Sequence, residues 1–336
     1  MLTSRIAIAG LAFLLTASAS AQDEVKATKL EKELNNPSGV VVHPKSGHVY
    51  ISSASGVLHY KPGKKGETKL HTEIGGYGND VYGKGPKYNI GPLGVAFLNG
   101  SHLVVGDGSR PDGEELVRIF KISTEEHSEQ KETDAVQTLG PITKSELTVK
   151  GEGNFYGVAV GAGAVFVTCN GDDTKGWVAK AEIKGGKVGE LKPFISTKEA
   201  TEVDAPVAIT VSPDAKSVVV GQGGEVGVPG DALLTFYDPA SGKLQKSVET
   251  GLSDITGLAY SPKTGKLYAT DFSWAAPDDA GLFEIDPESG DAKKIIALEK
   301  PTGLAFDKRG RLYITEFGAD GESKKTGALR RIRPGL

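Results

Sequence analysis

Apolar and polar residues follow a short pattern that recurs six times along the chain. Its clearest copies read Pro-Leu-Gly-Val-Ala-Phe from Pro92 and Pro-Thr-Gly-Leu-Ala-Phe from Pro301. After each copy, a tight polar turn leads into a second run that is rich in β-branched and aromatic residues. Such a pair of runs predicts a β-hairpin. The six hairpins start at Pro37, Pro92, Phe155, Pro206, Ile255 and Pro301.

A second hairpin follows the first in five of the six units. Residues 233–237 and 243–249, for example, are joined by Asp238-Pro239-Ala240-Ser241-Gly242. This is a turn sequence, because Pro fixes φ, Asp bonds its own backbone and Gly accepts a positive φ. Each unit therefore has four antiparallel strands. Units repeated about every 50 residues are typical of propeller blades, so the predicted fold is an all-β, six-bladed β-propeller.

The sixth unit is one strand short. Its third strand is predicted at residues 328–332, and the chain ends at Leu336. Residues 27–34 belong to no unit and alternate enough to form a strand. Pairing them with residues 328–332 would close the ring and remove two open sheet edges. The alternative is an unpaired N-terminal tail.

The first 21 residues have the pattern of a secretory signal peptide. Arg5 precedes an apolar run over residues 6–15, and Ala19-Ser20-Ala21 forms a small-residue cleavage signal. The run is about half as long as the roughly 20 residues that a membrane-spanning helix needs, so no membrane span is expected. We expect a secreted or periplasmic protein in which residues 22–336 form a single propeller domain. Cys169 is the one cysteine, so the mature chain is expected to be a disulfide-free monomer.

The loops of one face of the ring are predicted to be long and acidic. In a propeller, the loops that lead into the first strands share a face with the loops between strands two and three. The latter are long here, as at residues 107–115, 222–231 and 271–281, and their net charge is negative. An acidic face attracts cations and repels phosphates, so nucleic acid is not an expected partner.

An amide or carboxylate residue stands just before the first strand of five units. Three of these residues, Asn36, Asn154 and Asp254, share one register, three positions before the glycine of the repeat. In a closed ring they would converge on the mouth of the channel. Oxygen ligands of this kind suit Ca²⁺. The alternative is that Asn and Asp cap turns at these positions. The five residues are Asn36, Asn89, Asn154, Asp204 and Asp254.

The blade signature resembles that of a known family. Residues 255–271 and 301–316 carry Gly-Leu-Ala-aromatic followed by Leu-Tyr-(Ile/Ala)-Thr-(Asp/Glu). This pattern is similar to that of NHL-repeat propellers and of the six-bladed gluconolactonase and senescence-marker-protein type. The resemblance covers residues 27–336.

This resemblance implies one divalent ion at the top of the channel, held by Glu, Asn and Asp side chains. Asn154, with Asp204 or Asp254, would match that set, whereas Asn36 stands where the family has Glu. The predicted metal ligands are therefore Asn36, Asn154, Asp204 and Asp254. The expected ion is Ca²⁺, and Asp204 or Asp254 would position or deprotonate water in catalysis.

The remaining chemistry narrows the choice of function. We expect none of the six histidines on the acidic loop face, and their spacing along the chain shows no zinc motif. Four aromatic residues on that side could stack on a ligand or pack the rim of the face, namely Tyr77, Tyr82, Tyr88 and Trp274. The first hypothesis is a secreted binding protein that recognises a small molecule, glycan or protein on the acidic face. The alternative is a divalent-metal-dependent lactonase or esterase.

Overall fold

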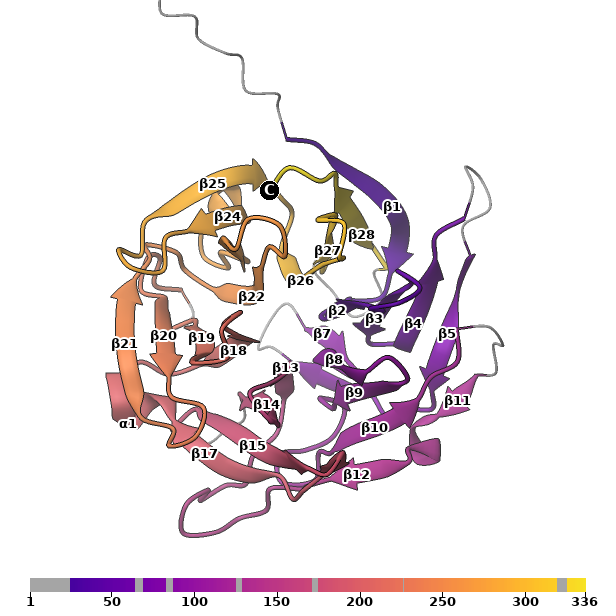
Figure 1. The fold of residues 1–336 in the computed structure, drawn as a ribbon, viewed down its shortest axis with the longest axis vertical. Coiled ribbons are helices and arrows are strands. Elements are labelled where there is room, and N and C mark those ends of the chain that lie inside the picture. The colour runs from indigo at the N-terminus through magenta and orange to yellow at the C-terminus, as the bar shows by residue number, and fades with distance from the viewer. Residues whose placement is uncertain are drawn as a thin grey trace, which may run out of the picture.

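The strands form six antiparallel sheets around a central axis (Figure 1). This computed structural model describes residues 25–63, 69–82, 87–124, 129–170, 175–225, 227–318 and 325–336. The predicted signal peptide lies outside the described residues. The predicted six-bladed β-propeller is confirmed.

Each blade consists of consecutive strands, numbered from the axis outward. Blade one comprises β2 (Val40–Val42), β3 (Val49–Ser53), β4 (Gly56–Lys61) and β5 (Lys69–Gly75), with β11 (Gln130–Lys131) paired to β5. Blade two comprises β8 (Val95–Asn99), β9 (His102–Gly106), β10 (Val117–Lys121) and β12 (Gln137–Leu139). Blade three comprises β13 (Phe155–Gly161), β14 (Ala164–Cys169), β15 (Trp177–Lys184), β16 (Lys187–Val188) and β17 (Lys192–Ser196).

The second half of the ring repeats this arrangement. Blade four comprises β18 (Pro206–Val211), β19 (Val218–Gln222), β20 (Leu233–Tyr237) and β21 (Leu244–Glu249). Blade five comprises β22 (Ile255–Tyr260), β23 (Leu267–Asp271), β24 (Gly281–Ile285) and β25 (Ala292–Ala297). Blade six comprises β26 (Pro301–Phe306), β27 (Leu312–Glu316), β28 (Gly327–Ile332) and β1 (Ala27–Leu34). Outside the blades lie the hairpin of β6 (Asp80–Tyr82) and β7 (Tyr88–Ile90) and the short helices η1 (Glu132–Asp134), α1 (Thr197–Thr201) and η2 (Pro277–Asp279).

The N-terminal strand closes the ring as predicted. β1 pairs antiparallel with β28, from Ala27 opposite Ile332 to Leu34 opposite Gly327. Leu34 is buried in a cluster with Tyr313 and Leu329 of blade six and with residues of blade one. Closure therefore joins the two ends of the ring through both a strand pair and a shared core.

A repeated contact sets the distance between neighbouring inner strands. A Cβ on Gly157 would collide with the carbonyl oxygen of Val207 on the next inner strand, so only glycine fits there. The hydroxyl of Thr168 accepts a hydrogen bond from Gly157 N–H and donates one to the same Val207 carbonyl, each at 2.8 Å. Three further hydroxyls donate to the next blade in the same way, those of Ser52, Thr270 and Thr315. In blades two and four the position equivalent to Thr168 has no hydroxyl, because it is occupied by Gly106 and Gly221.

The second strands form the most deeply buried layer. Every residue of β14, β19, β23 and β27 is buried, and the apolar clusters bridge adjacent blades. Cys169 lies in one of these clusters, and burial raises the pKa of its thiol. Its role is therefore packing. No helix among the described residues has the length and apolar character needed to cross a membrane.

The closure contact predicts a specific loss of stability. Leu34→Ala should lower the free energy of unfolding by about 2–4 kcal/mol, because it leaves a cavity between blades one and six. Chemical denaturation measures this loss. Lys29→Ala, an exposed change in the same strand, is the control. Equal effects from the two variants would refute the closure argument.

The hydrogen bonds of the Thr168 hydroxyl predict a second loss of stability. Thr168→Val keeps the shape of the side chain but leaves the Gly157 N–H and the Val207 carbonyl without their shared partner. We expect a cost of about 1–3 kcal/mol in chemical denaturation. Thr210→Val, the same change on a channel-lining strand, should cost less than half as much. If Thr168→Val leaves the free energy of unfolding unchanged, the hydrogen bonds of the Thr168 hydroxyl do not stabilise the contact between these blades.

Candidate functional site

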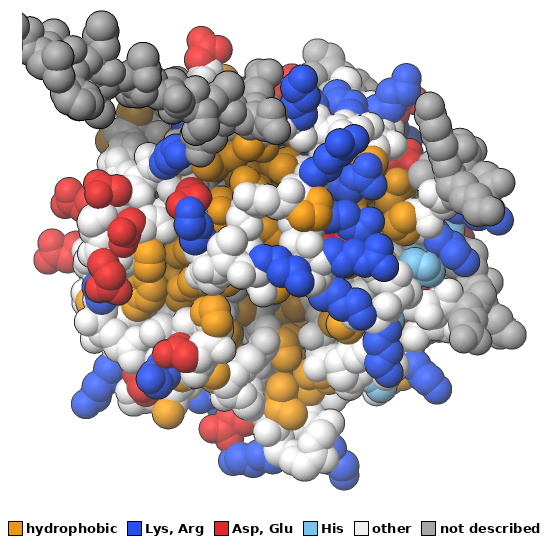
Figure 2. Space-filling model, turned by 45° about the horizontal axis from the view of Figure 1, so that its top comes forward, with side chains coloured by type: hydrophobic (Ala, Val, Ile, Leu, Met, Phe, Trp, Pro, Cys, Tyr) orange, Lys and Arg blue, Asp and Glu red, His pale blue; other side chains and the backbone are white. Residues whose placement is uncertain are grey.

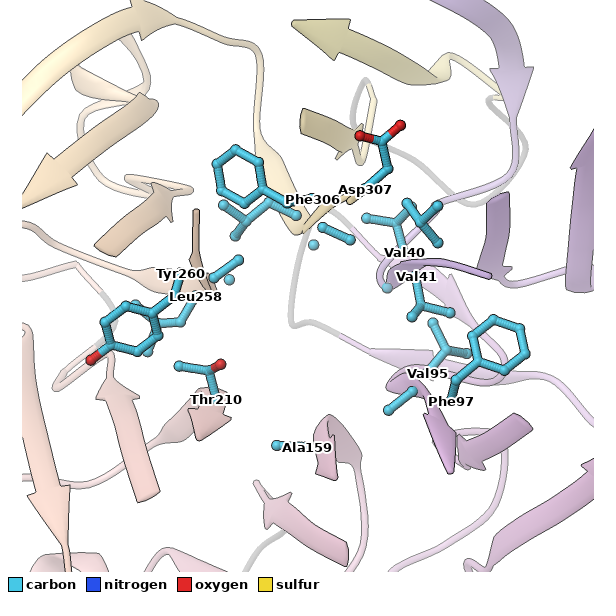
Figure 3. Close-up of a pocket in the computed structure, with 18 of the residues that line it drawn as sticks. Val40, Val41, Val95, Phe97, Ala159, Thr210, Leu258, Tyr260, Phe306 and Asp307 are labelled. Atoms are coloured by element: carbon cyan, nitrogen blue, oxygen red, sulfur yellow. The ribbon is translucent and has the colours of Figure 1, made fainter. Parts of the chain in front are cut away.

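Two cavities lie on the propeller axis. The larger, here the channel cavity, has a volume of about 920 Å³ and is surrounded by inner-strand residues. Figure 3 shows Val41, Val95, Phe97, Leu258 and Phe306 around it. The smaller, here the mouth cavity, has a volume of about 180 Å³ and lies where the chain enters the first strands.

The rim of the channel cavity is basic. Lys45, Lys308, Arg309 and Arg311 contribute to its lining, and Arg311 pairs with Asp307. Figure 2 shows Lys and Arg side chains gathered on one side of a hydrophobic centre and Asp and Glu on the other. The channel cavity thus offers apolar walls and a basic rim. None of the predicted site residues lines it.

The mouth cavity contains the predicted register of polar residues. We define the mouth positions as the residues three places before the repeat glycine or its equivalent, namely Asn36, Gly91, Asn154, Ala205, Asp254 and Lys300. The first five of these line the mouth cavity. The structure therefore brings together Asn36, Asn154 and Asp254, as the shared register indicated.

Backbone contacts hold the mouth positions in place. In blades three to six, the residue after the second strand donates a backbone hydrogen bond to the carbonyl of the mouth position, as Phe272 N does to Asp254 O at 3.0 Å and Gly223 N to Ala205 O at 2.9 Å. Four mouth positions have a positive φ, namely Asn36 (43°), Asn154 (45°), Ala205 (55°) and Lys300 (47°). Asn adopts this conformation readily, so it serves both the turn and the cavity.

Asn36 carries an unused acceptor. Its side-chain Nδ2 donates to the backbone carbonyl of Asn89 at 3.0 Å. Its Oδ1 is buried and has no hydrogen-bond partner among the described residues. An unpaired buried acceptor costs free energy, and a cation at the mouth would supply the missing partner. The side chain of Asn89 instead accepts a hydrogen bond from Asn79.

Asp254 is a half-buried carboxylate. Its Oδ2 accepts a hydrogen bond from Trp274 N at 2.6 Å. Burial raises the pKa of Asp254 against the effect of that hydrogen bond, and the charges of Asp271 and Asp231 raise it further. An ionised carboxylate is thus disfavoured here unless a cation compensates it.

Asp204 lies one residue before the mouth position of blade four. Its Oδ1 accepts from Ala205 N at 2.7 Å, and its Oδ2 lies 3.4 Å from the ammonium of Lys198. Lys198 belongs to α1, which precedes this blade. Ala205 rather than Asp204 lines the cavity, so the structure places Asp204 beside the other three predicted residues and not among them.

Buried polar groups behind the mouth brace the leading loops. Asp271 accepts hydrogen bonds from Ser253 N and Asp254 N at 3.1 and 2.7 Å. Glu316 accepts a hydrogen bond from Glu299 N, and the side chain of Gln222 donates one to the carbonyl of Val203. These second-strand ends therefore act as positioning residues.

Glu115 braces blade three, which sequence reasoning missed. It accepts a hydrogen bond from Asn154 N, and burial raises the pKa of Glu115 to about 9. Burial thus favours the uncharged form of this carboxyl group, which accepts the hydrogen bond from Asn154 N.

Aromatic rings form one wall of the mouth cavity. Tyr88 meets Trp274 and Phe317 edge to face at 5.5 and 5.2 Å between ring centroids, and Phe272 stacks on Trp274 at 5.3 Å. Tyr88 and Trp274 were candidates from the sequence, whereas Phe272 and Phe317 were missed. Their signal was the shared sequence Thr-Asp-Phe and Thr-Glu-Phe at the two strand ends. Tyr77 packs over Arg118 instead.

The donor set of the mouth fits a hard divalent cation. Asn36 and Asn154 offer amide oxygens, and Asp254 offers a carboxylate. Ca²⁺ prefers oxygen ligands of these kinds. The unused Asn36 oxygen and the raised pKa of Asp254 both indicate groups that a bound cation would stabilise.

The fold is shared with several solved structures. A luciferin-regenerating enzyme matches with a TM-score of 0.56 and 14% identity, over 93% of this chain and 96% of the other. A gluconolactonase from Xanthomonas campestris matches with a TM-score of 0.56 and 13% identity, over 92% and 90%. A Thermus thermophilus protein named as a glucose dehydrogenase matches with a TM-score of 0.58 and 15% identity, over 92% and 100%.

These likenesses show that the chain shares the six-bladed propeller fold of these proteins. No protein-family model matches the chain, and no curated protein sequence shows significant similarity to it.

The raised pKa of Asp254 predicts a pH-dependent stability. Because its ordinary value is 3.8 and the folded value is higher, the folded state binds the proton more tightly, and stability is lost as pH rises through that window. Asp254→Asn removes this penalty. In chelator-treated protein its melting temperature should exceed that of the wild type at pH 7, and the difference should vanish below about pH 4.

The control is Asp278→Asn, which removes an equal charge from an exposed position between β23 and β24 of the same blade. It should show no such pH dependence. A lower melting temperature for Asp254→Asn at pH 7 would contradict the assigned burial effect.

Proposed function

We propose that this protein is a divalent-cation-dependent hydrolase of a small lactone or ester, with its site in the mouth cavity. The observation that carries the proposal is the convergence of Asn36, Asn154 and Asp254 on one cavity. Of these, Asn36 presents a buried oxygen without a hydrogen-bond partner among the described residues.

The metal site would use three oxygen donors. Asn36, Asn154 and Asp254 would hold Ca²⁺, which is the expected ion for amide and carboxylate ligands. When bound, the cation supplies Lewis-acid polarisation of an ester carbonyl. Lys300, at the sixth mouth position, lies 5.8 Å from the ring of Tyr88 and outside the set of lining residues.

Residues around the cation would orient water, pack against the substrate and support the loop. Because Trp274 N–H occupies Oδ2 of Asp254, Oδ1 would face both the cation and a water molecule beside it. The ring wall of Tyr88, Trp274 and Phe317 would pack the apolar face of the substrate and exclude bulk water. Asp204 is tied to Lys198 and Ala205 N. The proposal therefore assigns the orientation of water to Asp254 and the support of the loop to Asp204.

The structural likenesses favour hydrolysis over binding alone. One neighbour is described as a gluconolactonase, and the propeller fold also carries the luciferin-regenerating enzyme. Ester chemistry at a small polar and aromatic mouth agrees with the gluconolactonase. We further propose that the chain is exported, because residues 1–21 have the pattern of a signal peptide.

Calcium binding tests the metal site. Ca²⁺ at 100 times its Kd should stabilise chelator-treated wild type by about 2.7 kcal/mol. Asp254→Asn should abolish most of this stabilisation by Ca²⁺. Asp204→Asn should reduce it by a smaller amount, and Asp278→Asn should leave it unchanged. Calorimetry and thermal melting provide the two readouts. No binding of Ca²⁺, Mg²⁺ or Mn²⁺ would remove the metal site.

Lactone hydrolysis tests the reaction. The Ca²⁺-loaded protein should release acid from δ- and γ-lactones of simple sugars, as followed with a pH indicator, and Asp254→Asn should reduce kcat by about 100-fold or more. Ligand binding without acid release would support the binding-protein alternative instead.

A further inference from the structure

A second group of metal-ligating side chains lies on blade one, away from the mouth. His59 of β4 stands directly opposite His71 of β5 in the strand pairing. Glu73 follows His71 by two residues, so both project from the same face of β5. Tyr50 of β3 stands opposite His59 and stacks on its ring at 4.4 Å between centroids. The four side chains form a row across one face of the blade.

The ligand atoms of this row have the spacing of a metal site. One atom from each of His59, His71 and Glu73 lies within 4.8 Å of the other two. His59 Nδ1 is 3.0 Å and His71 Nε2 is 3.5 Å from the same carboxylate oxygen, Oε2 of Glu73. Atoms bound at about 2.0–2.1 Å to one tetrahedral Zn²⁺ are about 3.3 Å apart, between these two distances.

A neighbouring histidine fixes the orientation of the first. His59 Nε2 lies 2.9 Å from Nδ1 of His48, within hydrogen-bond distance. With Nδ1 of His59 on a metal, Nε2–H would donate to His48, which is the outer contact that metal-bound histidines commonly make. Stacking on Tyr50 holds the same ring from its face. His59 is thus constrained on two sides.

The row is buried except for one member. The side chains of His59 and Glu73 are 4% and 3% exposed, whereas that of His71 is 25% exposed. A metal could reach the site past His71. β4 and β5 are the outer half of blade one, so the row is at the periphery of the ring while the mouth cavity is on its axis.

We propose that His59, His71 and Glu73 form a binding site for a first-row transition ion, with Zn²⁺ as the expected occupant. Two imidazoles and one carboxylate suit Zn²⁺ and not Ca²⁺, which prefers oxygen ligands alone. The ion would clamp β4 to β5 and leave a fourth position for water. This site does not depend on the function proposed for the mouth.

The test titrates Zn²⁺ into chelator-treated, untagged mature protein, with Ca²⁺ present throughout to keep the mouth site constant. Calorimetry should show one Zn²⁺ per chain, and Co²⁺ in its place should give the visible absorption of a tetrahedral site. His71→Ala and Glu73→Gln should each weaken Zn²⁺ binding by about 100-fold or more. His48→Gln should weaken it by about 10–100-fold.

The matched control is His102→Ala, which removes a histidine of blade two that contacts Asn99 and Ser101 and lies outside the row. Its Zn²⁺ affinity should equal that of the wild type. If Glu73→Gln fails to fold by circular dichroism, the partly exposed His71→Ala variant decides. Absent Zn²⁺ binding in the wild type, or binding that His71→Ala leaves unchanged, would overturn the site and reduce the row to a buried hydrogen-bonded network.

Discussion

The close approach of neighbouring inner strands is the constraint on which the rest of the structure depends. At Gly157 the next strand's carbonyl occupies the space of a side chain, and Thr168 bonds to both strands at once. The hydroxyl satisfies a backbone donor and a backbone acceptor that would otherwise be buried without partners. In blade two a second glycine, Gly106, stands in place of the hydroxyl, and in blade four Gly221 pairs with Ala208, which replaces the repeat glycine. In the other five blades the repeat glycine is a packing requirement, because a Cβ there would collide with a backbone oxygen of the next blade.

The same register builds the mouth cavity. The residue three places before the repeat glycine or its equivalent lines the mouth cavity in five of the six blades. Backbone hydrogen bonds from the ends of the second strands hold these residues, as Phe272 N holds Asp254 O. Buried groups such as Asp271 then fix the preceding loop. The propeller backbone thus sets the positions of the mouth residues, and the type of residue at these positions differs from blade to blade.

The sequence alone predicted the parts of the molecule that follow from periodicity. The blades, the closing strand and the shared register of Asn36, Asn154 and Asp254 all rest on repeated spacing. Asp204 was placed less well, because blade four begins one residue later relative to its acidic residue, and the Lys198 of a locally inserted helix draws the carboxylate away. The row of His59 and His71 gave no spacing signal. Their side chains meet because His59 stands opposite His71 in the β4–β5 pairing, a register that their spacing along the chain does not specify.

The distribution of unfavourable features distinguishes the two cavities. The channel cavity is the larger, but its inner wall is made of apolar side chains in ordinary strand geometry. At the mouth, by contrast, four of six equivalent residues adopt a positive φ, Asn36 has an unsatisfied oxygen and Asp254 has a raised pKa. Each of these costs free energy in the isolated protein. A cation and a reacting ester would use these oxygens directly, and for this reason the proposed function is assigned to the smaller cavity.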